Sequence, residues 1–539
     1  MTIDQKIVQL RTAKGISQEQ LAEALGVSRQ SVSKWEMGQM FPRIDKVLQL
    51  CELFGVCADE LLRENVDIPK TSVSKTKNKY FGTDGFRGEA NVTLTSMHAY
   101  KLGRFLGWYY SSRLSGCSRA GYRPRIVIGK DTRRSSYMLE YSIVAGITAS
   151  GADAYMLHVT TTPSVSYVTR TEEFDCGIMV TASHNPYWDN GIKVINSHGE
   201  KIDDETISLI EAYLDGDLAA LGIDGEDLPL AQKAHIGCIF DHVAGRNRYI
   251  GYLISIASNS YKNLKIGLDC ANGASWNIAN AVFSALGAQT YVIGNEPNGL
   301  NINEQCGSTH IEKLQRLVRE KHLDIGFAFD GDADRCLAID ENGGLIDGDA
   351  IIYILGKRLK SKGMLNGDTV VTTVMSNSGF IESLERIGIK GIQTAVGDRF
   401  VYECMQNNDY AIGGEQSGHI IMKKYATTGD GILTAIMVAE EICDSKTSLS
   451  KLAEPIKLYP QYLENVRVKN KALAVSDENV KKEIKHVEGL LNGQGRVLLR
   501  QSGTEPVVRV MVEAVTYEKC VEYARAVVKA IRDGGHCVE

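Results

Sequence analysis

The chain has 539 residues, of which 43% are hydrophobic and 23% are charged, and its formal net charge is −6. At the usual domain size of about 100–200 residues, this length predicts roughly three to five domains. The composition is that of a globular protein and excludes an intrinsically disordered chain. The negative net charge excludes a protein that coats DNA with its whole surface, but it leaves room for a local nucleic-acid-binding domain.

Several features of the chain predict a cytoplasmic protein. No run approaches ~18 apolar residues, the length of a membrane-spanning helix, so we expect no membrane contact. The opening MTIDQKIVQL lacks the basic segment and apolar core of a secretory signal. The twelve cysteines are scattered without a C-x-x-C pair, which is typical of reduced thiols rather than of disulfides or a zinc site.

A small domain of short helices is predicted for residues 1–63. Ser17 begins an S-x-x-Q capping box that opens a helix with Leu21 and Leu25 on one face. After a turn that contains glycine, Ser28 caps a second short helix. Two short helices joined in this way match the geometry of a helix-turn-helix motif.

The same domain is predicted to continue with one more helix and to end in a linker. In the second helix Val32 and Trp35 face inward, and a further helix follows Pro42 with an apolar face that includes Val47. Residues 64–78 are polar and show no helical period. They are therefore predicted to be a linker.

From Tyr80 onward, β-rich apolar runs alternate with helical stretches. The runs are RIVIGKD, GIMVTAS, LKIGLDC, DIGFAFD, TVVTTVM and YAIGGE. Their alternation predicts βαβ units with mostly parallel sheets, followed by a small α+β domain from about Tyr459. Ligands collect at the carboxyl ends of strands in such sheets, so the polar loops that follow these runs are the candidate functional sites.

The first such loop, TASHNPYWDNGIK, spans residues 181–193. Ser183 stands at a strand end, where it could act as a nucleophile or phosphoryl carrier. His184 and Lys193 could move protons or hold negative oxygens. The alternative is a structural loop in which the serine caps a helix.

The second loop is DGDADR, with carboxylates at Asp330, Asp332 and Asp334. In an extended segment, side chains at this spacing point the same way, and three aligned carboxylates repel one another unless a cation lies between them. Oxygen ligands suit Mg²⁺, and Arg335 could pair with a phosphate oxygen. The alternative is a solvated acidic turn.

The third loop is GGEQSGH, in which Glu415, Ser417 and His419 alternate and could share one face. Such groups suit sugar hydroxyls, which need both donors and acceptors, although a plain turn is an equally simple reading. The fourth loop is RQSGTEPVVR, spanning residues 500–509. Its hydroxyls, backbone N–H groups and two arginines suit a phosphate, and no Walker motif is present in the sequence.

Together these loops supply a phosphoryl carrier, a cation site, a sugar-reading loop and a phosphate grip, which is sufficient for phosphoryl transfer. In this order they resemble the α-D-phosphohexomutase superfamily, and YFGTDGFRG at residues 80–88 is a fifth match. The similarity covers residues 79–539. Gln416 in the sugar loop, with NINEQCGSTH, TAVGDRFV and TTGDGILTA, is most similar to the bacterial phosphoglucosamine mutase branch.

The resemblance implies a fold and a reaction. The expected fold is an all-α helix-turn-helix module followed by three α/β domains, at residues 79–240, 241–343 and 344–457, and an α+β domain at 458–539. The expected reaction passes a phosphoryl group from Ser183 to glucosamine 6-phosphate, giving glucosamine 1,6-bisphosphate as intermediate and activator. After this intermediate reorients, its 6-phosphoryl group returns to Ser183 and glucosamine 1-phosphate remains.

The resemblance also implies roles for individual residues. One Mg²⁺ per active site would be held by Asp330, Asp332, Asp334 and an oxygen of phosphorylated Ser183. The residues implied at the transferring group are His184, Lys193, Arg335 and Arg87. Those implied in substrate binding are Glu415, Ser417 and His419 at the sugar, and Arg500, Ser502, Gly503, Thr504 and Arg509 at the phosphate that is not transferred.

Residues 15–56 resemble repressor-type helix-turn-helix domains, whose second motif helix enters the major groove of double-stranded DNA. The resemblance implies that Arg29, Gln30 and Lys34 would read bases or phosphates, and that a homodimer would bind paired half-sites. The alternative is a folded module that contacts protein or binds no DNA, since the charge of this segment is nearly balanced.

Two alternatives for the whole chain remain. The first is a phosphomannomutase or phosphoglucomutase, because the superfamily shares one architecture. The second is a DNA-binding regulator that uses the mutase part only as a sensor of sugar phosphates. Ser183 and the three aspartates disfavour a sensor, which needs no transfer nucleophile.

Overall fold

The computed structural model describes residues 2–14, 16–54, 61, 79–82, 84–114, 122–501 and 507–538. The chain forms a small amino-terminal unit that extends to Lys77 and a large unit that begins at Asn78. The linker predicted at residues 64–78 lies outside the described residues. Within the described ranges, every helix falls short of the length or the apolar character that a membrane crossing requires.

The small unit is helical, as predicted. The Ser17 hydroxyl accepts a hydrogen bond from the Gln20 N–H, and the Gln20 side chain accepts one from the Ser17 N–H, which completes the capping box. Ser28 caps the next helix through the N–H of Ser31, and Val32 and Trp35 are buried. The helices are α1 (Ile3–Ala13), α2 (Gln18–Ala24), α3 (Arg29–Glu36) and α4 (Ile44–Phe54).

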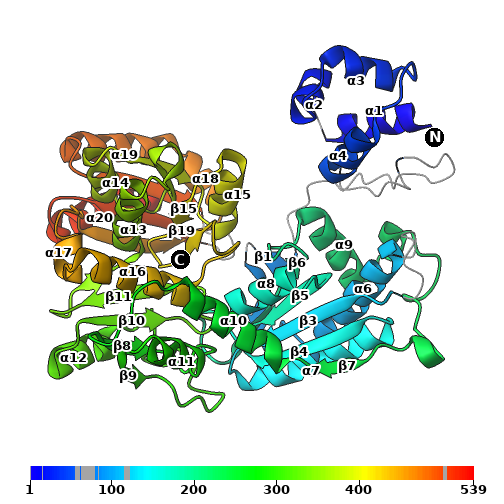
Figure 1. Ribbon diagram of the computed structural model, residues 1–539. Coiled ribbons are helices and arrows are strands. Elements are labelled where there is room, and N and C mark those ends of the chain that lie inside the picture. Colours follow the sequence, from blue (N-terminus) through cyan, green and yellow to red (C-terminus); the bar gives the residue numbers. More distant parts are fainter. Residues whose placement is uncertain are drawn as a thin grey trace. The chain divides into compact units, whose positions relative to one another are not determined.

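The first sheet of the large unit has the strand order β1-β2-β6-β5-β3-β4-β7 (Figure 1). Strands β5, β3, β4 and β7 run parallel, whereas β1, β2 and β6 are joined in antiparallel pairs. Its strands are β1 (Phe81–Gly82), β2 (Gly85–Glu89), β3 (Arg125–Lys130), β4 (Asp153–Val159), β5 (Cys176–Val180), β6 (Asp189–Asn196) and β7 (Ile239–Asp241). The helices of this region are α6 (Ser96–Leu114), α7 (Arg134–Ala149), α8 (Thr162–Thr171), α9 (Asp204–Asp215) and α10 (Val243–Ile256).

The second and third sheets have the orders β12-β11-β10-β8-β9 and β14-β13-β15-β16. Their apolar side chains form one continuous core, to which α13 and α16 contribute. The strands are β8 (Lys265–Asp269), β9 (Gln289–Ile293), β10 (Ile325–Phe329), β11 (Cys336–Asp340), β12 (Leu345–Ile346), β13 (Thr369–Thr373), β14 (Lys390–Thr394), β15 (Ile412–Gly414) and β16 (Ile420–Met422). The helices are α11 (Ile278–Ala285), α12 (Glu312–Lys321), α13 (Gly348–Ser361), α14 (Ser378–Arg386), α15 (Asp398–Asn408), α16 (Gly431–Ser445) and α17 (Leu449–Ala453).

The fourth sheet is antiparallel, with the order β17-β19-β18, and it has its own core. The predicted strands of the carboxyl-terminal α+β region and its final helix are confirmed. The elements are β17 (Gln461–Arg467), α18 (Lys471–Ser476), α19 (Glu478–Leu491), β18 (Arg496–Gln501), β19 (Val507–Glu513) and α20 (Tyr517–Asp533).

The expectation of mostly parallel sheets is only partly correct. All six predicted strand runs form strands, and their pairs β3–β5, β8–β10 and β13–β15 are parallel. The second, third and fourth candidate loops, however, follow β10, β15 and β18, each of which pairs with the next strand in antiparallel fashion. A hairpin returns the chain at once after β10 and after β15, so the second and third loops are turns at strand ends rather than entries into helices.

Candidate active site

Ser183 follows β5 in a loop whose backbone is held from several sides. The residue has a left-handed φ of 52° and is 1% exposed. Its N–H donates to Thr181 Oγ1 over 3.0 Å, and its carbonyl oxygen accepts from Arg133 Nη2 at 3.0 Å and Asn303 Nδ2 at 2.9 Å. The loop leads into β6, so Ser183 caps none of the described helices and the alternative of a helix cap is wrong. A non-glycine residue with positive φ is uncommon, and surrounding contacts of this kind are what maintain it.

Asp330, Asp332 and Asp334 converge, but not for the reason that the sequence suggested. They lie in the turn between β10 and β11, where Ala333 has a φ of 55°, and not in an extended segment. One carboxylate oxygen from each residue lies within 4.8 Å of the others, and all three side chains are buried. The turn, rather than strand alternation, therefore brings the carboxylates together, and the alternative of a solvated acidic turn is wrong.

The serine loop and the acidic loop are in direct contact. The Ser183 hydroxyl donates a hydrogen bond of 2.6 Å to Asp330 Oδ2, between residues 147 positions apart in the chain. A Cβ on Gly331 would lie 2.5 Å from the carbonyl oxygen of Ser183, so only glycine permits this approach. Burial and the carboxylates of Asp334 and Asp332 raise the pKa of Asp330 well above its ordinary value.

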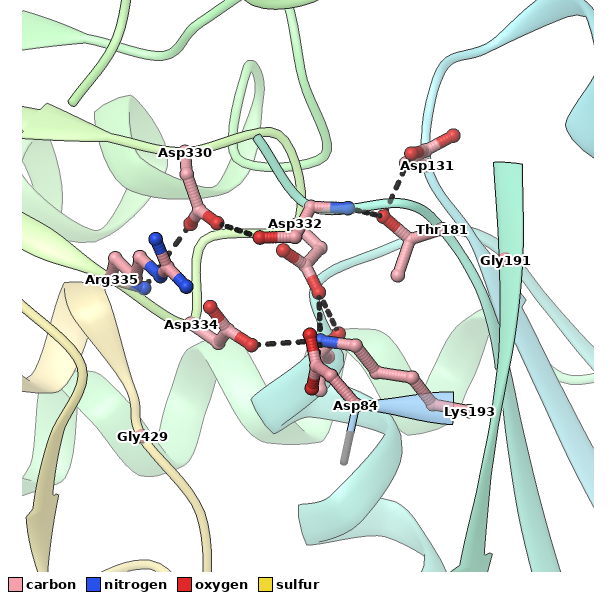
Figure 2. Close-up of polar contacts among 12 residues, drawn as sticks. Asp84, Asp131, Thr181, Gly191, Lys193, Asp330, Asp332, Asp334, Arg335 and Gly429 are labelled. Carbon is pink, nitrogen blue, oxygen red and sulfur yellow. Dashed lines mark hydrogen bonds and ion pairs between the residues drawn. The ribbon is translucent and has the colours of Figure 1, made fainter. Parts of the chain in front are cut away.

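Lys193, on β6, places its ammonium group among these carboxylates (Figure 2). Its Nζ lies 2.8 Å from Asp332 Oδ2 and 2.8 Å from Asp334 Oδ2. Burial acts to lower the pKa of Lys193, but Asp332, Asp334 and a third carboxylate, Asp84, raise it well above its ordinary value. The Lys193 ammonium group thus supplies part of the positive charge that three neighbouring carboxylates require.

The acidic cluster also has the donor set of a magnesium site. The second oxygen of Asp332 is buried and has no hydrogen-bond partner among the described residues, and the second oxygen of Asp334 is buried 3.6 Å from His419 Nδ1. Buried carboxylate oxygens rarely stay without partners, and hard divalent cations prefer oxygen ligands. The residues present therefore fit Mg²⁺.

Three further predicted residues surround Ser183. His184 Nδ1 lies 3.3 Å from the Ser183 hydroxyl, and burial together with Arg335 and Arg87 lowers the pKa of His184 to about 4. The backbone N–H of Arg335 donates a hydrogen bond of 3.1 Å to Asp330 Oδ1. Arg87, on β2, is paired with Asp84 and donates to Asn185 Oδ1 at 3.4 Å.

The sugar loop is a tight turn and not an alternating strand, because the Gly418 N–H donates to the carbonyl oxygen of Glu415 at 3.0 Å. Glu415 Oε1 accepts from the N–H of Gly397, and the buried Ser417 hydroxyl has no partner among the described residues. Glu415, Ser417 and His419 therefore lie in a turn, so the strand-like alternation from which a shared face was predicted is absent.

His419 is buried between two carboxylates and joins the loop to the acidic cluster. Its Nδ1 lies 3.6 Å from Asp334 Oδ1, and its Nε2 lies 3.4 Å from Asp398 Oδ2. Burial acts to lower the pKa of His419, but Asp334 and Asp398 raise it to about 9.

These contacts complete a closed ring of alternating acidic and basic side chains that links the first three sheets. Lys201 bridges Asp398, at 2.7 Å, and Asp84, at 3.0 Å, and Asp84 Oδ1 lies 3.6 Å from Lys193 Nζ. The ring, in order, is Asp84, Lys193, Asp334, His419, Asp398 and Lys201. Four residues of this region are not predicted by the single loops, namely Asp84, Lys201, Asp398 and Asn303. Three of the four lie in YFGTDGFRG, TAVGDRFV and NINEQCGSTH, so those stretches carried the signal.

Arg500 and Arg509 are directly opposite each other on β18 and β19. Burial and the charge of Arg509 lower the pKa of Arg500, while Glu415 acts to raise it. Two like charges that face each other across a strand pair repel one another. A phosphate bound between Arg500 and Arg509 would remove this repulsion, so the pair suits a phosphate-binding site. The predicted residues Ser502, Gly503 and Thr504 lie outside the described part of the chain.

In the small unit, Arg29, Gln30 and Lys34 lie on α3 and are exposed. Arg29 Nε is 2.7 Å from Glu19 Oε1 on α2. All three predicted DNA-contacting side chains are thus accessible on the second helix of the motif, and one of them is paired with a carboxylate.

Comparison with known proteins agrees with this arrangement. Family profiles for phosphoglucomutase/phosphomannomutase match the chain in sequence: alpha/beta/alpha domain I at residues 78–219, domain II at 247–344, domain III at 347–459 and the C-terminal domain at 463–530. A helix-turn-helix profile matches residues 7–61.

Similar proteins and structures extend over the same region. The chain is 58% identical to a phosphoglucosamine mutase of Lachnospira eligens, over 85% of this chain and 100% of that protein, and 47% identical to one of Bacillus subtilis, over 84% and 98%. A phosphoglucomutase/phosphomannomutase family structure from Burkholderia thailandensis aligns with a TM-score of 0.68 at 20% identity, over 85% of this chain and 98% of that one. The chain belongs to the phosphoglucosamine mutase family of phosphohexomutases, which are isomerases, and it carries a helix-turn-helix domain ahead of the mutase region.

Proposed function

We propose that the chain interconverts glucosamine 6-phosphate and glucosamine 1-phosphate through a phosphorylated Ser183 and a 1,6-bisphosphate intermediate. The contact of the Ser183 hydroxyl with Asp330, inside a buried cluster of three carboxylates, is the observation that carries the proposal. The names of the relatives, phosphoglucosamine mutases at up to 58% identity, support the choice of glucosamine. A solved N-acetylphosphoglucosamine mutase of Aspergillus fumigatus, in complex with GlcNAc-6P and magnesium, shares the fold at a TM-score of 0.62 and 19% identity.

In the first half-reaction, the 1-hydroxyl oxygen of glucosamine 6-phosphate forms a bond to the phosphorus on Ser183. The bond between that phosphorus and Oγ breaks, and the proton lost by the sugar hydroxyl ends on Oγ. We assign His184, whose Nδ1 lies 3.3 Å from Oγ, to that proton transfer. In the second half-reaction Oγ attacks the phosphorus of the 6-phosphoryl group of the reoriented bisphosphate. The bond between that phosphorus and the sugar O6 breaks and the proton of Oγ passes to O6, which regenerates phosphoserine and releases glucosamine 1-phosphate.

Charge neutralisation accounts for the remaining residues. Asp330, Asp332 and Asp334, with an oxygen of phosphoserine, would hold Mg²⁺, which withdraws charge from the transferring phosphoryl group when bound. Lys193, Arg335 and Arg87 would hold its equatorial oxygens. The loop of Glu415, Ser417 and His419 would contact the sugar. Arg500 and Arg509, with Ser502, Gly503 and Thr504, would hold the phosphate that is not transferred.

A substrate panel tests the reaction and the sugar together. Values of kcat/KM are measured for glucosamine, mannose and glucose 6-phosphates with Mg²⁺ and a bisphosphate primer, and glucosamine is expected to give the highest. A clear preference for mannose or glucose would establish the phosphomannomutase or phosphoglucomutase alternative instead.

A serine variant separates an enzyme from a sensor of sugar phosphates. Ser183→Ala should remove nearly all turnover and leave the circular dichroism spectrum unchanged. Ser208→Ala, which removes a surface hydroxyl from α9, is the matched control and should keep full activity. Substantial turnover in Ser183→Ala would mean that the nucleophile is misassigned, and a wild-type chain without mutase activity would favour the sensor.

We further propose that the amino-terminal domain binds double-stranded DNA through Arg29, Gln30 and Lys34, as part of a homodimer. The exposure of all three side chains on α3 supports this, as does the helix-turn-helix profile. Selection from random DNA followed by binding of Lys34→Gln tests it, and weaker binding by the variant is expected. Absence of any sequence-specific binding by the wild type would reject the proposal.

A further inference from the structure

The large unit contains a second cavity, separate from the catalytic loops, at the carboxyl ends of β4 and β9. Its volume is about 830 Å³, within the usual range for small-molecule sites, and His158 of β4 and Asn295 beyond β9 are among its lining residues. The active-site loops follow β5 and β10. Because the strand orders are β5-β3-β4 and β10-β8-β9, one strand of each sheet lies between the two sites. At that position the Thr132 hydroxyl donates to the carbonyl oxygen of Asn272 at 2.6 Å.

The cavity lining carries positive charge and unsatisfied polar atoms. Arg134 at the start of α7 and Arg246 on α10 both line it, against one lining carboxylate, Glu296. Nε of Arg246 and Oδ1 of Asn277 are buried and have no hydrogen-bond partner among the described residues. Buried polar atoms without partners are rare in folded proteins, and here two of them belong to side chains that line the same cavity. An anionic group on a ligand could accept from the guanidinium groups, and a ligand hydroxyl could donate to Asn277 Oδ1.

The remaining lining residues narrow the class of that ligand. Two rings, Trp276 and Tyr137, line the cavity and are 37% and 46% exposed. Asparagine amides, which both donate and accept hydrogen bonds, occur at Asn277, Asn295 and Asn298. Guanidinium groups bind phosphate, amides match hydroxyl groups, and an aromatic face packs against the apolar face of a sugar ring. We infer that this cavity is a second binding site, for a hexose phosphate.

The cavity shares a chain segment with the catalytic serine loop. Asp131 accepts a hydrogen bond of 2.8 Å from the Thr181 hydroxyl, which in turn accepts from the N–H of Ser183. Arg133 donates to the carbonyl oxygen of Ser183, whereas the next residue, Arg134, faces the cavity. A ligand in the cavity would therefore contact the segment that fixes the backbone of Ser183. The inference concerns a site that lacks the acidic cluster and Ser183, so it stands independently of the proposed reaction.

Binding stoichiometry tests the inference. The full chain carrying Ser183→Ala, which prevents turnover, is titrated calorimetrically with glucosamine 6-phosphate, and two sites per chain are expected. Adding Arg246→Gln should abolish one site, while adding Arg500→Gln should weaken the other by at least tenfold. Arg248→Gln is the matched control, because Arg248 also lies on α10 but pairs with Glu172 outside the cavity. It should leave both sites intact.

The ligand class is tested by comparing probes at the site that Arg246→Gln removes. Glucosamine 6-phosphate and glucose 6-phosphate are expected to bind at least tenfold more tightly than inorganic phosphate, and Trp276→Ala should erase that difference. A number of sites that Arg246→Gln leaves unchanged would overturn the inference. A single site that Arg246→Gln abolishes would support the inference and would instead contradict binding of glucosamine 6-phosphate at the active site. Equal binding of inorganic phosphate, or tighter binding of uridine monophosphate than of either sugar phosphate, would overturn the assignment to hexose phosphates.

Discussion

Gly331 faces Ser183 so closely that a Cβ at position 331 would lie 2.5 Å from the serine carbonyl oxygen. This approach keeps the acidic loop within hydrogen-bond reach of the candidate nucleophile. The position between two acidic residues of DGDADR thus has a steric requirement of its own, separate from the chemistry of its neighbours. The carbonyl oxygen of Ser183 belongs to the backbone, so it cannot move aside as the end of a flexible side chain can.

Gly331→Ala should separate the two loops and lower kcat/KM by about 100-fold, since a displacement near 1 Å can cost that much in catalysis. Gly251→Ala is the control, because nothing lies within 4 Å of a Cβ at that position of α10. Steady-state kinetics of both variants check the prediction. Near wild-type kcat/KM in Gly331→Ala would contradict it.

Lys201 should act as a positioning residue, because it is the cation between Asp84 and Asp398 in the charged ring. Lys201→Met leaves two carboxylates short of a partner, which should disturb Lys193 and His419 and lower kcat by at least about tenfold, or 1.4 kcal/mol. Lys201→Arg should recover part of the loss. The affinity for Mg²⁺ should change little.

A variant outside the ring provides the control for Lys201. Arg399 pairs with Asp204 and Glu403, so Arg399→Gln also removes charge between the first and third sheets but leaves the ring intact. Its kcat should stay close to that of the wild type. Equal losses in Arg399→Gln and Lys201→Met would show that the effect is one of general stability.

Metal removal should inactivate the protein, and loss of the Asp332 carboxylate should raise the Mg²⁺ concentration that is needed to restore activity. We expect a chelator to abolish turnover and added Mg²⁺ to recover it. Asp332→Asn removes one carboxylate of the cluster and should raise the Mg²⁺ concentration for half-maximal activity by about 10–100-fold. Asp224→Asn, on an exposed loop, should not. Full activity of the wild type after exhaustive chelation would reject the metal assignment.

Asp269 should make stability depend on pH. Burial raises its pKa to about 6 from 3.8, although the N–H groups of Gly307 and Ala271 oppose the shift. The folded state therefore binds more protons than the unfolded state between these values, so stability falls as pH rises from about 4 to about 6, by up to about 3 kcal/mol. In Asp269→Asn the contribution of this residue to the fall should disappear. Thermal unfolding midpoints of both proteins across that range check it, and parallel curves would contradict it.

Sequence alone determined which segments carry the chemistry. The capping box at Ser17, the helix cap at Ser28, the six strand runs and the polar loops after them depend on local propensity and on patterns within about ten residues, and they occur as expected. The motifs also indicated the family, because each loop must keep its residue types for the loop to have a function.

Only the tertiary structure decided how those segments meet. In the folded chain the acidic segment is a turn and not an extended segment, His419 contacts Asp334, and Arg500 lies opposite Arg509. It also brought Asp84, Lys201 and Asp398 into one ring with Lys193. The three contacts Asp84–Lys193, Asp84–Lys201 and Lys201–Asp398 join residues more than a hundred positions apart, and they follow from strand pairing and the packing of sheets. Neither strand pairing nor sheet packing is encoded in local sequence patterns, so only the folded chain shows which residues a charged side chain contacts.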